Sequence, residues 1–268
     1  MEGLIRRAAE ALRRSRFAVA LTGAGMSTES GVPDFRGPSG IWTRDPEAEK
    51  KAYHSYERFR RNPKEYWVER LTGPSLLGDL AAVTPNPGHL ALSELEGAGI
   101  LKWVITQNID NLHQRAGSKK VIDYHGNAFK LRCASCVARY ESEDFDLEKM
   151  LRAGTLPPLC RRCGGAVKSD IVHFHESIPP DVSSLSLEAA LTSDVMLVCG
   201  TSAVVYPFAN LPHLARRHRQ DGSSSFTLIE VNAEPTPLTE QNISDFFIQG
   251  RTGEILPRLA AEIRGKKV

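Results

Sequence analysis

The chain has 268 residues, of which 41% are hydrophobic and 25% are charged. This length suits one large domain, or a large domain that carries a smaller one. The formal net charge of +2 carries no strong nucleic-acid signal, and the first apolar run, residues 17–21, is far too short for a membrane span or a signal-peptide core. We therefore expect a folded cytoplasmic protein. The basic runs are interpreted as solvated faces of two helices, and they comprise Arg13, Arg14 and Arg16, then Arg216, Arg217 and Arg219.

Short runs of apolar and β-branched residues predict buried strands. These runs are residues 17–21, 103–106, 121–124, 195–199, 227–231 and 246–248. Helical patterns precede the first, second and fifth runs, at residues 4–14, 88–97 and 208–219. Strands that alternate with helices indicate parallel strands covered on both faces. We predict an α/β fold with a Rossmann-like, doubly wound parallel sheet.

Two segments interrupt this alternation. Residues 41–85 carry aromatic and charged residues in a helical pattern, and residues 131–168 carry four cysteines with little apolar periodicity. We expect these insertions to pack together as a small domain, a helical module plus a four-cysteine zinc ribbon. The larger NAD-binding domain would then comprise residues 1–40, 86–130 and 169–268.

The four cysteines form two Cys-x-x-Cys pairs, Cys133/Cys136 and Cys160/Cys163, separated by 23 residues. Two tight turns of this kind supply the four sulfur ligands that zinc prefers, so they predict one closed, structural zinc site. Two redox-active pairs are the alternative. The fifth cysteine, Cys199, lies inside an apolar run and is interpreted as a small buried hydrophobe.

The first predicted strand runs into the turn Gly23-Ala24-Gly25. Such glycines let the backbone approach a pyrophosphate, whose charge would lie against a helix N-terminus. A dehydrogenase fingerprint has Gly or Ala where this chain has Thr28, and no acidic ribose ligand follows a second strand. The pattern indicates a nucleotide site without a redox role, with an ordinary tight turn as the alternative.

Polar residues also end three later predicted strands. They are Gln107, Asn108 and Asp110, then Gly200, Thr201 and Ser202, then Asn232. The carboxyl ends of parallel strands meet at one edge of the sheet, where ligands bind. Each group alone is explained by a turn or cap, but three together favour a site.

These motifs, in this order, resemble those of the sirtuin family. The matching stretches are GAGMS from Gly23, PDFRG from Pro33, TQNID from Thr106, YHG from Tyr124, the two cysteine pairs, and GTS from Gly200. The resemblance covers nearly the whole chain. It implies an NAD-dependent protein-lysine deacylase, a transferase that moves the acyl group of lysine to the ADP-ribose part of NAD and releases nicotinamide. Its partners would be acyl-lysine proteins.

The resemblance also implies residue roles. The cofactor-binding set is Gly23, Ala24, Gly25, Thr28, Asp34, Phe35, Arg36, Gln107, Asn108, Ile109, Asp110, Gly200, Thr201, Ser202 and Asn232. Within it, Gln107 and Asn108 hold the ribose, Phe35, Ile109 and Asp110 the nicotinamide, and Thr201, Ser202 and Asn232 the adenosine end. The catalytic set is His125 as general base with Asn108 and Asp110.

An imidazole suits this task because its ordinary pKa of about 6.5 lets it accept a ribose hydroxyl proton near neutral pH. A hydrogen-bonded core histidine is the alternative for His125. His113 has no comparable context and is interpreted as structural.

The chain departs from the family in the segment that pairs with substrate backbone. Family members usually have Val-x-Phe-Gly-Glu, and here the residues are Val172, His173, Phe174, His175 and Glu176. We expect His175 to add bulk and a titratable group there, although strand addition itself needs only backbone groups. A second metal bound by the two histidines is an alternative.

Acyl preference rests on a second comparison with the family. Sirtuins that prefer acidic acyl groups resemble one another in having a Tyr and an Arg three residues apart. The nearest pairs here, Tyr56/Arg60 and Tyr66/Arg70, are four apart, so we expect uncharged acyl groups such as acetyl. The rival hypotheses are a protein mono-ADP-ribosyltransferase that uses the same site, and a non-enzymatic NAD sensor or zinc-ribbon binding protein.

Overall fold

The computed structural model describes residues 1–38, 40–220 and 225–265. Its large sheet is parallel throughout, with the strand order β3-β2-β1-β7-β8-β9. The strands are β1 (Ala18–Thr22), β2 (Leu101–Thr106), β3 (Val121–Asp123), β7 (Val195–Cys199), β8 (Thr227–Asn232) and β9 (Phe246–Gln249). The chain runs outward from β1 to β3, then returns to the other side of β1 at β7. This order confirms the predicted doubly wound sheet and puts its topological switch point between β1 and β7.

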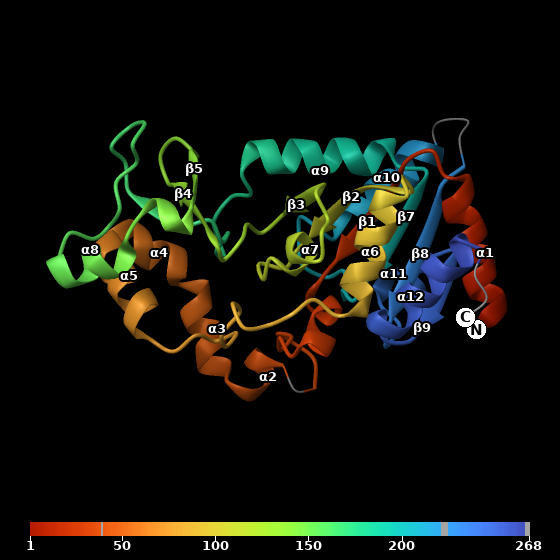
Figure 1. The fold of residues 1–268 in the computed structure, drawn as a ribbon, viewed down its shortest axis with the longest axis horizontal. Helices are drawn as coiled ribbons and strands as arrows, with labels where there is room; N and C mark the ends of the chain where they lie inside the picture. The colour runs from red at the N-terminus through yellow and green to blue at the C-terminus, as the bar shows by residue number, and fades with distance from the viewer. Residues whose placement is uncertain (39, 221–224, 266–268) are drawn as a thin grey trace.

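Helices cover both faces of this sheet (Figure 1). On one face lie α1 (Glu2–Arg14), α6 (Pro87–Gly97) and α12 (Thr252–Ile263), and on the other lie α9 (Pro180–Thr192) and α10 (Asn210–Gln220). Successive β1 residues alternate between the two cores, since Ala18 and Ala20 pack with the first helix set and Val19 and Leu21 with the second. The short helices α7 (Leu112–Arg115) and α11 (Pro237–Glu240) follow β2 and β8.

A second, antiparallel sheet has the order β5-β4-β6. Its strands are β4 (Lys130–Cys133), β5 (Arg139–Glu141) and β6 (Val167–Ser169), with the 3-10 turn η3 (Ser142–Asp144) and helix α8 (Leu147–Ala153) between the last two. The sequence patterns did not reveal these strands. They lie beside α4 (Ser55–Arg61) and α5 (Pro63–Thr72), away from the two chain ends (Figure 1). Helices α2 (Ile41–Arg44) and α3 (Pro46–Tyr53) precede these two in the chain.

The two insertions share a hydrophobic core. Phe59 and Trp67 from α4 and α5 pack with Leu131 and Val167 from the small sheet. The indole of Trp67 donates to the Val167 carbonyl over 2.8 Å. The helical pattern expected for residues 41–85 holds only as far as Thr72, because residues 73–85 form turns and coil.

The structure also tests the expectations for Cys199, for the basic residues and for membrane spans. Cys199 is fully buried, as predicted. Arg13, Arg14, Arg16 and Arg217 are exposed, but Arg216 is half-buried, since it donates to the Ile243 carbonyl and pairs with Asp245. The side chain of Arg219 lies outside the described part of the chain. No helix among the described residues is long and apolar enough to cross a membrane.

Candidate functional site

The loops after β1 and β7 touch at the switch point. The Gly25 N–H donates to the Gly200 carbonyl over 2.8 Å, and the Gly23 N–H to the Cys199 carbonyl over 3.3 Å. Gly200 has a φ of 58°, and a Cβ atom there would lie 2.3 Å from the backbone nitrogen of Met26. Glycine is therefore required on sterics alone.

One detail of the glycine turn differs from expectation. The turn leads into two 3-10 segments, η1 (Ala24–Met26) and η2 (Thr28–Ser30), and not into a long helix. The predicted helix N-terminus for a pyrophosphate is therefore wrong, and the backbone N–H groups there belong to short turns.

A cavity of about 1680 Å³ runs from this switch point to the small sheet. It brings together all the predicted catalytic and substrate-binding residues, and every predicted cofactor residue except Gly23. Gly23 instead packs behind the cavity wall, where an added Cβ would lie 2.6 Å from Cβ of Thr201. Convergence of polar strand ends and aromatic side chains on one concavity is typical of a ligand site.

A hydrogen-bonded group joins the ends of β1 and β2. The Ser27 hydroxyl donates to the Asp110 carboxylate over 2.7 Å, and the Asn108 amide donates to the Ser27 oxygen over 3.1 Å. Asn108 also donates to the Gly23 carbonyl over 3.0 Å. Burial raises the pKa of Asp110. Nearby, Gln107 donates to Thr201 over 2.7 Å and so links the ends of β2 and β7.

The sequence patterns missed Ser27 and His89 as members of this group. His89 Nε2 lies 3.4 Å from the Ser27 hydroxyl, and its ring centroid lies 4.9 Å from that of His113. His113, interpreted as structural, is buried against the Thr22 hydroxyl at 2.9 Å. Ser27 stood inside a recognised motif, whereas His89 is 62 residues further along and carried no sequence signal.

His125 directly follows the Tyr124 that ends the predicted third strand, and its backbone is held tightly. Val172 donates to the His125 carbonyl over 2.8 Å. The next residue, Gly126, has a φ of 78°, and a Cβ there would lie 1.9 Å from the Asp170 carbonyl oxygen. Burial lowers the pKa of His125 to about 4. At pH 7 the ring is therefore neutral and free to accept a proton.

The segment Val172 to Glu176 forms the wall opposite the cofactor loop. Phe174 stacks on Tyr53 with ring centroids 4.3 Å apart, and lies 5.5 Å from Trp42. The His173 ring bonds the Tyr66 hydroxyl at 3.0 Å, and burial lowers its pKa to about 3. His173 is therefore a neutral, packed side chain near pH 7.

His175 lies in a tight turn closed by the Glu176 N–H, which donates to the His173 carbonyl over 3.1 Å. Its φ of 64° falls in the left-handed region, which favours glycine and explains why the family pattern has glycine there. His175 is exposed and faces Tyr53, so its bulk lies at the rim.

This backbone strain leads to a first prediction. We expect His175→Gly to raise the free energy of unfolding by about 1 kcal/mol, because removing the left-handed penalty outweighs the extra chain entropy of glycine. Urea denaturation of the two proteins measures the difference. Equal or lower stability of the variant would show that the turn is unstrained.

Buried histidines lead to a second prediction, on acid stability. Burial lowers the pKa of His89 and His125 to about 4 and that of His173 to about 3. Between pH 6.5 and these values the unfolded chain binds protons that the native state does not, so stability falls as the pH falls. At pH 5 the loss is about 2 kcal/mol per histidine. Thermal melts at pH 7 and pH 5 should show it.

The variant for that experiment is His173→Gln. Removing the half-buried His173 should lessen the loss of stability between pH 7 and pH 5. A protein that is equally stable at both pH values would contradict the sign of these pKa shifts.

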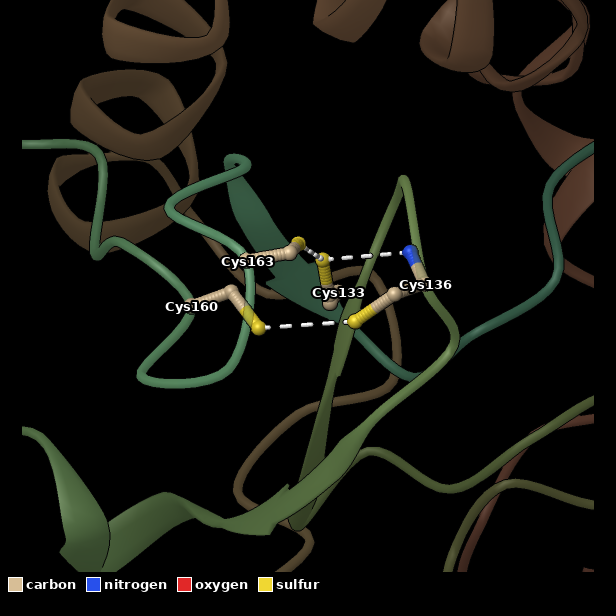
Figure 2. Close-up of side chains that lie close together, drawn as sticks. All are labelled: Cys133, Cys136, Cys160 and Cys163. Atoms are coloured by element: carbon tan, nitrogen blue, oxygen red, sulfur yellow. Dashed lines mark hydrogen bonds between the residues drawn. The ribbon is translucent and has the colours of Figure 1, made fainter.

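The four paired cysteines gather into one cluster (Figure 2). Their sulfur atoms all lie within 4.8 Å of one another, with Cys133–Cys163 at 3.5 Å and Cys136–Cys160 at 3.6 Å. Four thiolates about 2.3 Å from one zinc ion would be about 3.8 Å apart, so the donor set fits tetrahedral zinc. Backbone N–H groups of Ser135 and Arg162 point at Cys133 and Cys160 sulfurs over 3.3 and 3.4 Å, which stabilises thiolates.

The two Tyr/Arg pairs occupy different places. Tyr66 and Arg70 line the large cavity, but the Tyr66 hydroxyl is engaged by Ser169 and His173. Tyr56 and Arg60 line a separate pocket of about 520 Å³ beside His175.

The fold and site define a dinucleotide-binding α/β protein with a cysteine-ribbon module, and comparisons with known proteins specify its family. The Sir2 family model matches residues 23–207. "NAD-dependent protein deacylase 2" of Pyrobaculum aerophilum is 42% identical over 256 residues, covering 96% of this chain and 94% of the relative. The chain belongs to the Sir2, or sirtuin, family.

Solved structures of Sir2 proteins are similar to this chain over nearly its full length. A Sir2 homologue in complex with NAD has a TM-score of 0.75 and 36% identity, covering 97% of this chain and 93% of its own. A Sir2 variant with a deacetylated peptide and 3'-O-acetyl ADP-ribose has a TM-score of 0.76 and 35% identity, covering 96% and 98%.

Proposed function

We propose that this protein is an NAD-dependent protein-lysine deacetylase. It transfers the acyl group of an acyl-lysine to the ADP-ribose part of NAD, and nicotinamide leaves. The observation that carries the proposal is that one cavity holds the switch-point loops, His125 and the segment Val172 to Glu176 together. A cofactor and a peptide can therefore meet at one imidazole.

The cofactor would lie along the carboxyl edge of the large sheet. In this arrangement its phosphates lie against the loops after β1 and β7, where Gly25 and Gly200 pack so closely on the opposite loop that neither has room for a side chain. Asn108 and Asp110 are held by Ser27 toward the ribose and nicotinamide, and Phe35 covers that face to keep water out. Thr201, Ser202 and Asn232 bind the adenosine end.

His125 acts as the general base in this proposal. Breaking the nicotinamide bond leaves positive charge at the ribose carbon, which the acyl oxygen of lysine attacks if it is held close. A ribose hydroxyl must then lose its proton to attack the acyl carbon. His125, kept neutral by burial, accepts that proton.

The substrate backbone would add as a strand beside residues 172–176. We further propose the domain division into a large NAD-binding domain, residues 1–40, 86–130 and 169–268, and a small domain of residues 41–85 and 131–168. One zinc ion held by the four cysteines would be structural, because all four positions of a tetrahedral site are filled by protein. A reducing cytoplasm, which keeps such thiols available for metal, suits this ligand set.

The direct test incubates the protein with NAD and an acetyl-lysine peptide and identifies products by mass spectrometry. We expect deacetylated peptide together with acetylated ADP-ribose. ADP-ribosylated protein with an unchanged acetyl-peptide would favour mono-ADP-ribosyl transfer, and no NAD-dependent product would favour a sensor.

Acyl preference is tested with the same assay. We expect acetyl-lysine peptide to be turned over faster than succinyl-lysine peptide, because the Tyr66 hydroxyl is already engaged by Ser169 and His173. Faster succinyl removal would contradict this prediction.

A further inference from the structure

Four charged side chains are buried together behind the substrate segment. Arg132 lies on β4 and Lys168 faces it on β6, while Asp170 and Glu176 follow in the chain. The exposed fractions of these side chains are only 5%, 1%, 6% and 7%. Buried charges are costly unless they are paired, so the arrangement must be held by mutual contacts.

Glu176 is the member that joins this cluster to the substrate segment. One carboxylate oxygen accepts from Arg132 Nη2 over 3.0 Å, and the other lies 3.1 Å from Lys168 Nζ. The second oxygen also accepts from the backbone N–H of His173 over 3.0 Å. A single side chain thus links both strands of the small sheet to the backbone of the segment.

That contact decides which backbone groups of the segment remain available. Val172 donates to the His125 carbonyl, and His173 donates to Glu176. Among the residues that the structure describes, the N–H groups of Phe174 and His175 have no hydrogen-bond partner. Both residues line the cavity, so these N–H groups are available to a substrate backbone there.

We propose that Glu176 is a positioning residue for the substrate peptide, which locks residues 172–176 onto β4 and β6 in the conformation that pairs with peptide backbone. This proposal rests on the proposed function. It makes the small sheet part of the peptide-binding apparatus, because Arg132 neighbours the zinc ligand Cys133 and bonds both Asp170 and Glu176.

The charge balance of the cluster supports this role. With Glu176 present, two cations face two anions. Burial and the nearby Arg132 lower the pKa of Lys168 to about 8 even with Glu176 beside it. Removing the Glu176 charge would leave Arg132 and Lys168 sharing Asp170, so the segment would lose its ionic contacts with β4 and β6 and the cluster its neutrality.

The test compares Glu176→Gln with wild-type full-length protein, using an acetyl-lysine peptide. We expect KM for the peptide, and its dissociation constant by fluorescence anisotropy, to rise by at least about tenfold, because a small displacement of a positioning group is amplified in binding and rate. The dissociation constant of ADP-ribose should stay within about twofold, since the nucleotide loops are untouched.

Asp181→Asn is the matched control. Asp181 on α9 pairs with Arg139 on β5 over 2.6 Å. This ion pair also connects the small sheet to the rest of the chain, but it does not touch residues 172–176. Its peptide KM should equal that of wild type. If both variants weaken peptide binding equally, Glu176 contributes only general stability and the proposal is wrong.

A second variant distinguishes a loss of positioning from a loss of folding. Glu176→Gln combined with Lys168→Met removes one charge of each sign and restores neutrality around Arg132 and Asp170. Lys168 also donates to the Ile171 carbonyl, so Lys168→Met alone is the reference. If the double variant melts like wild type and binds peptide at least about tenfold more weakly than Lys168→Met alone, the positioning role stands. Peptide binding within about twofold of wild type would overturn it. A wild-type protein that binds peptide without deacetylating it would overturn the proposed function instead.

Discussion

Replacing His125 with alanine is expected to lower the rate of lysine deacetylation by about 10² to 10⁴, the usual contribution of a general base. The ring lines the cavity, and burial keeps it neutral at pH 7. In the proposed arrangement the ring meets the cofactor at one ribose hydroxyl and the loops after β1 and β7 hold the rest, so ADP-ribose should bind the variant with nearly wild-type affinity. Initial rates of peptide deacetylation at saturating NAD measure the effect.

The order of the chemical steps sharpens that experiment. The proton leaves the ribose hydroxyl only after the nicotinamide bond breaks, so nicotinamide release should be reduced less than deacetylation in His125→Ala. His54→Ala, at an exposed position outside the cavity, is the control and should behave as wild type. If nicotinamide release and deacetylation both persist at the wild-type rate without His125, another group is the base.

Removing zinc is expected to have the second large effect. Structural zinc contributes about 10–16 kcal/mol of apparent binding free energy in small metal-binding peptides, and here the cysteines hold strands of only three or four residues. We expect chelation, or Cys160→Ala, to unfold residues 130–169 and to abolish peptide turnover. Hydrogen exchange of this segment and elemental analysis for one zinc per chain measure both parts.

Cys199 supplies the control for that experiment. It is buried in the large sheet, away from the cluster, so Cys199→Ala should leave the zinc content at one per chain. Purified protein without zinc, or a small sheet that keeps its exchange protection after chelation, would contradict a structural metal site.

Much of the large sheet could be predicted because its strands are continuous apolar runs, as β7 shows with five buried residues. The small sheet could not. Its strand β4 reads Lys-Leu-Arg-Cys, and only tertiary contacts bury Arg132 there. Helix α12 was missed because it contains Pro257, which interrupts a helical pattern.

In the site, too, contiguous motifs could be predicted from the sequence, whereas contacts between residues distant in the chain could not. Motifs such as Gly23 to Ser27 and Gln107 to Asp110 are contiguous, so the sequence could point to them. The pKa of His125 depends on burial, and the role of Glu176 depends on partners 8 and 44 residues away, at Lys168 and Arg132. No local pattern records such contacts.

The central claim is that cleavage of NAD is coupled to acyl removal in the cavity that holds His125. The most direct measurement is the molar ratio of nicotinamide released to free lysine formed, with acetylated and unmodified peptides at saturating NAD. We predict a ratio of one with the acetylated peptide and negligible nicotinamide with the unmodified one. Nicotinamide released at equal rates with both peptides, without matching free lysine, would contradict the account.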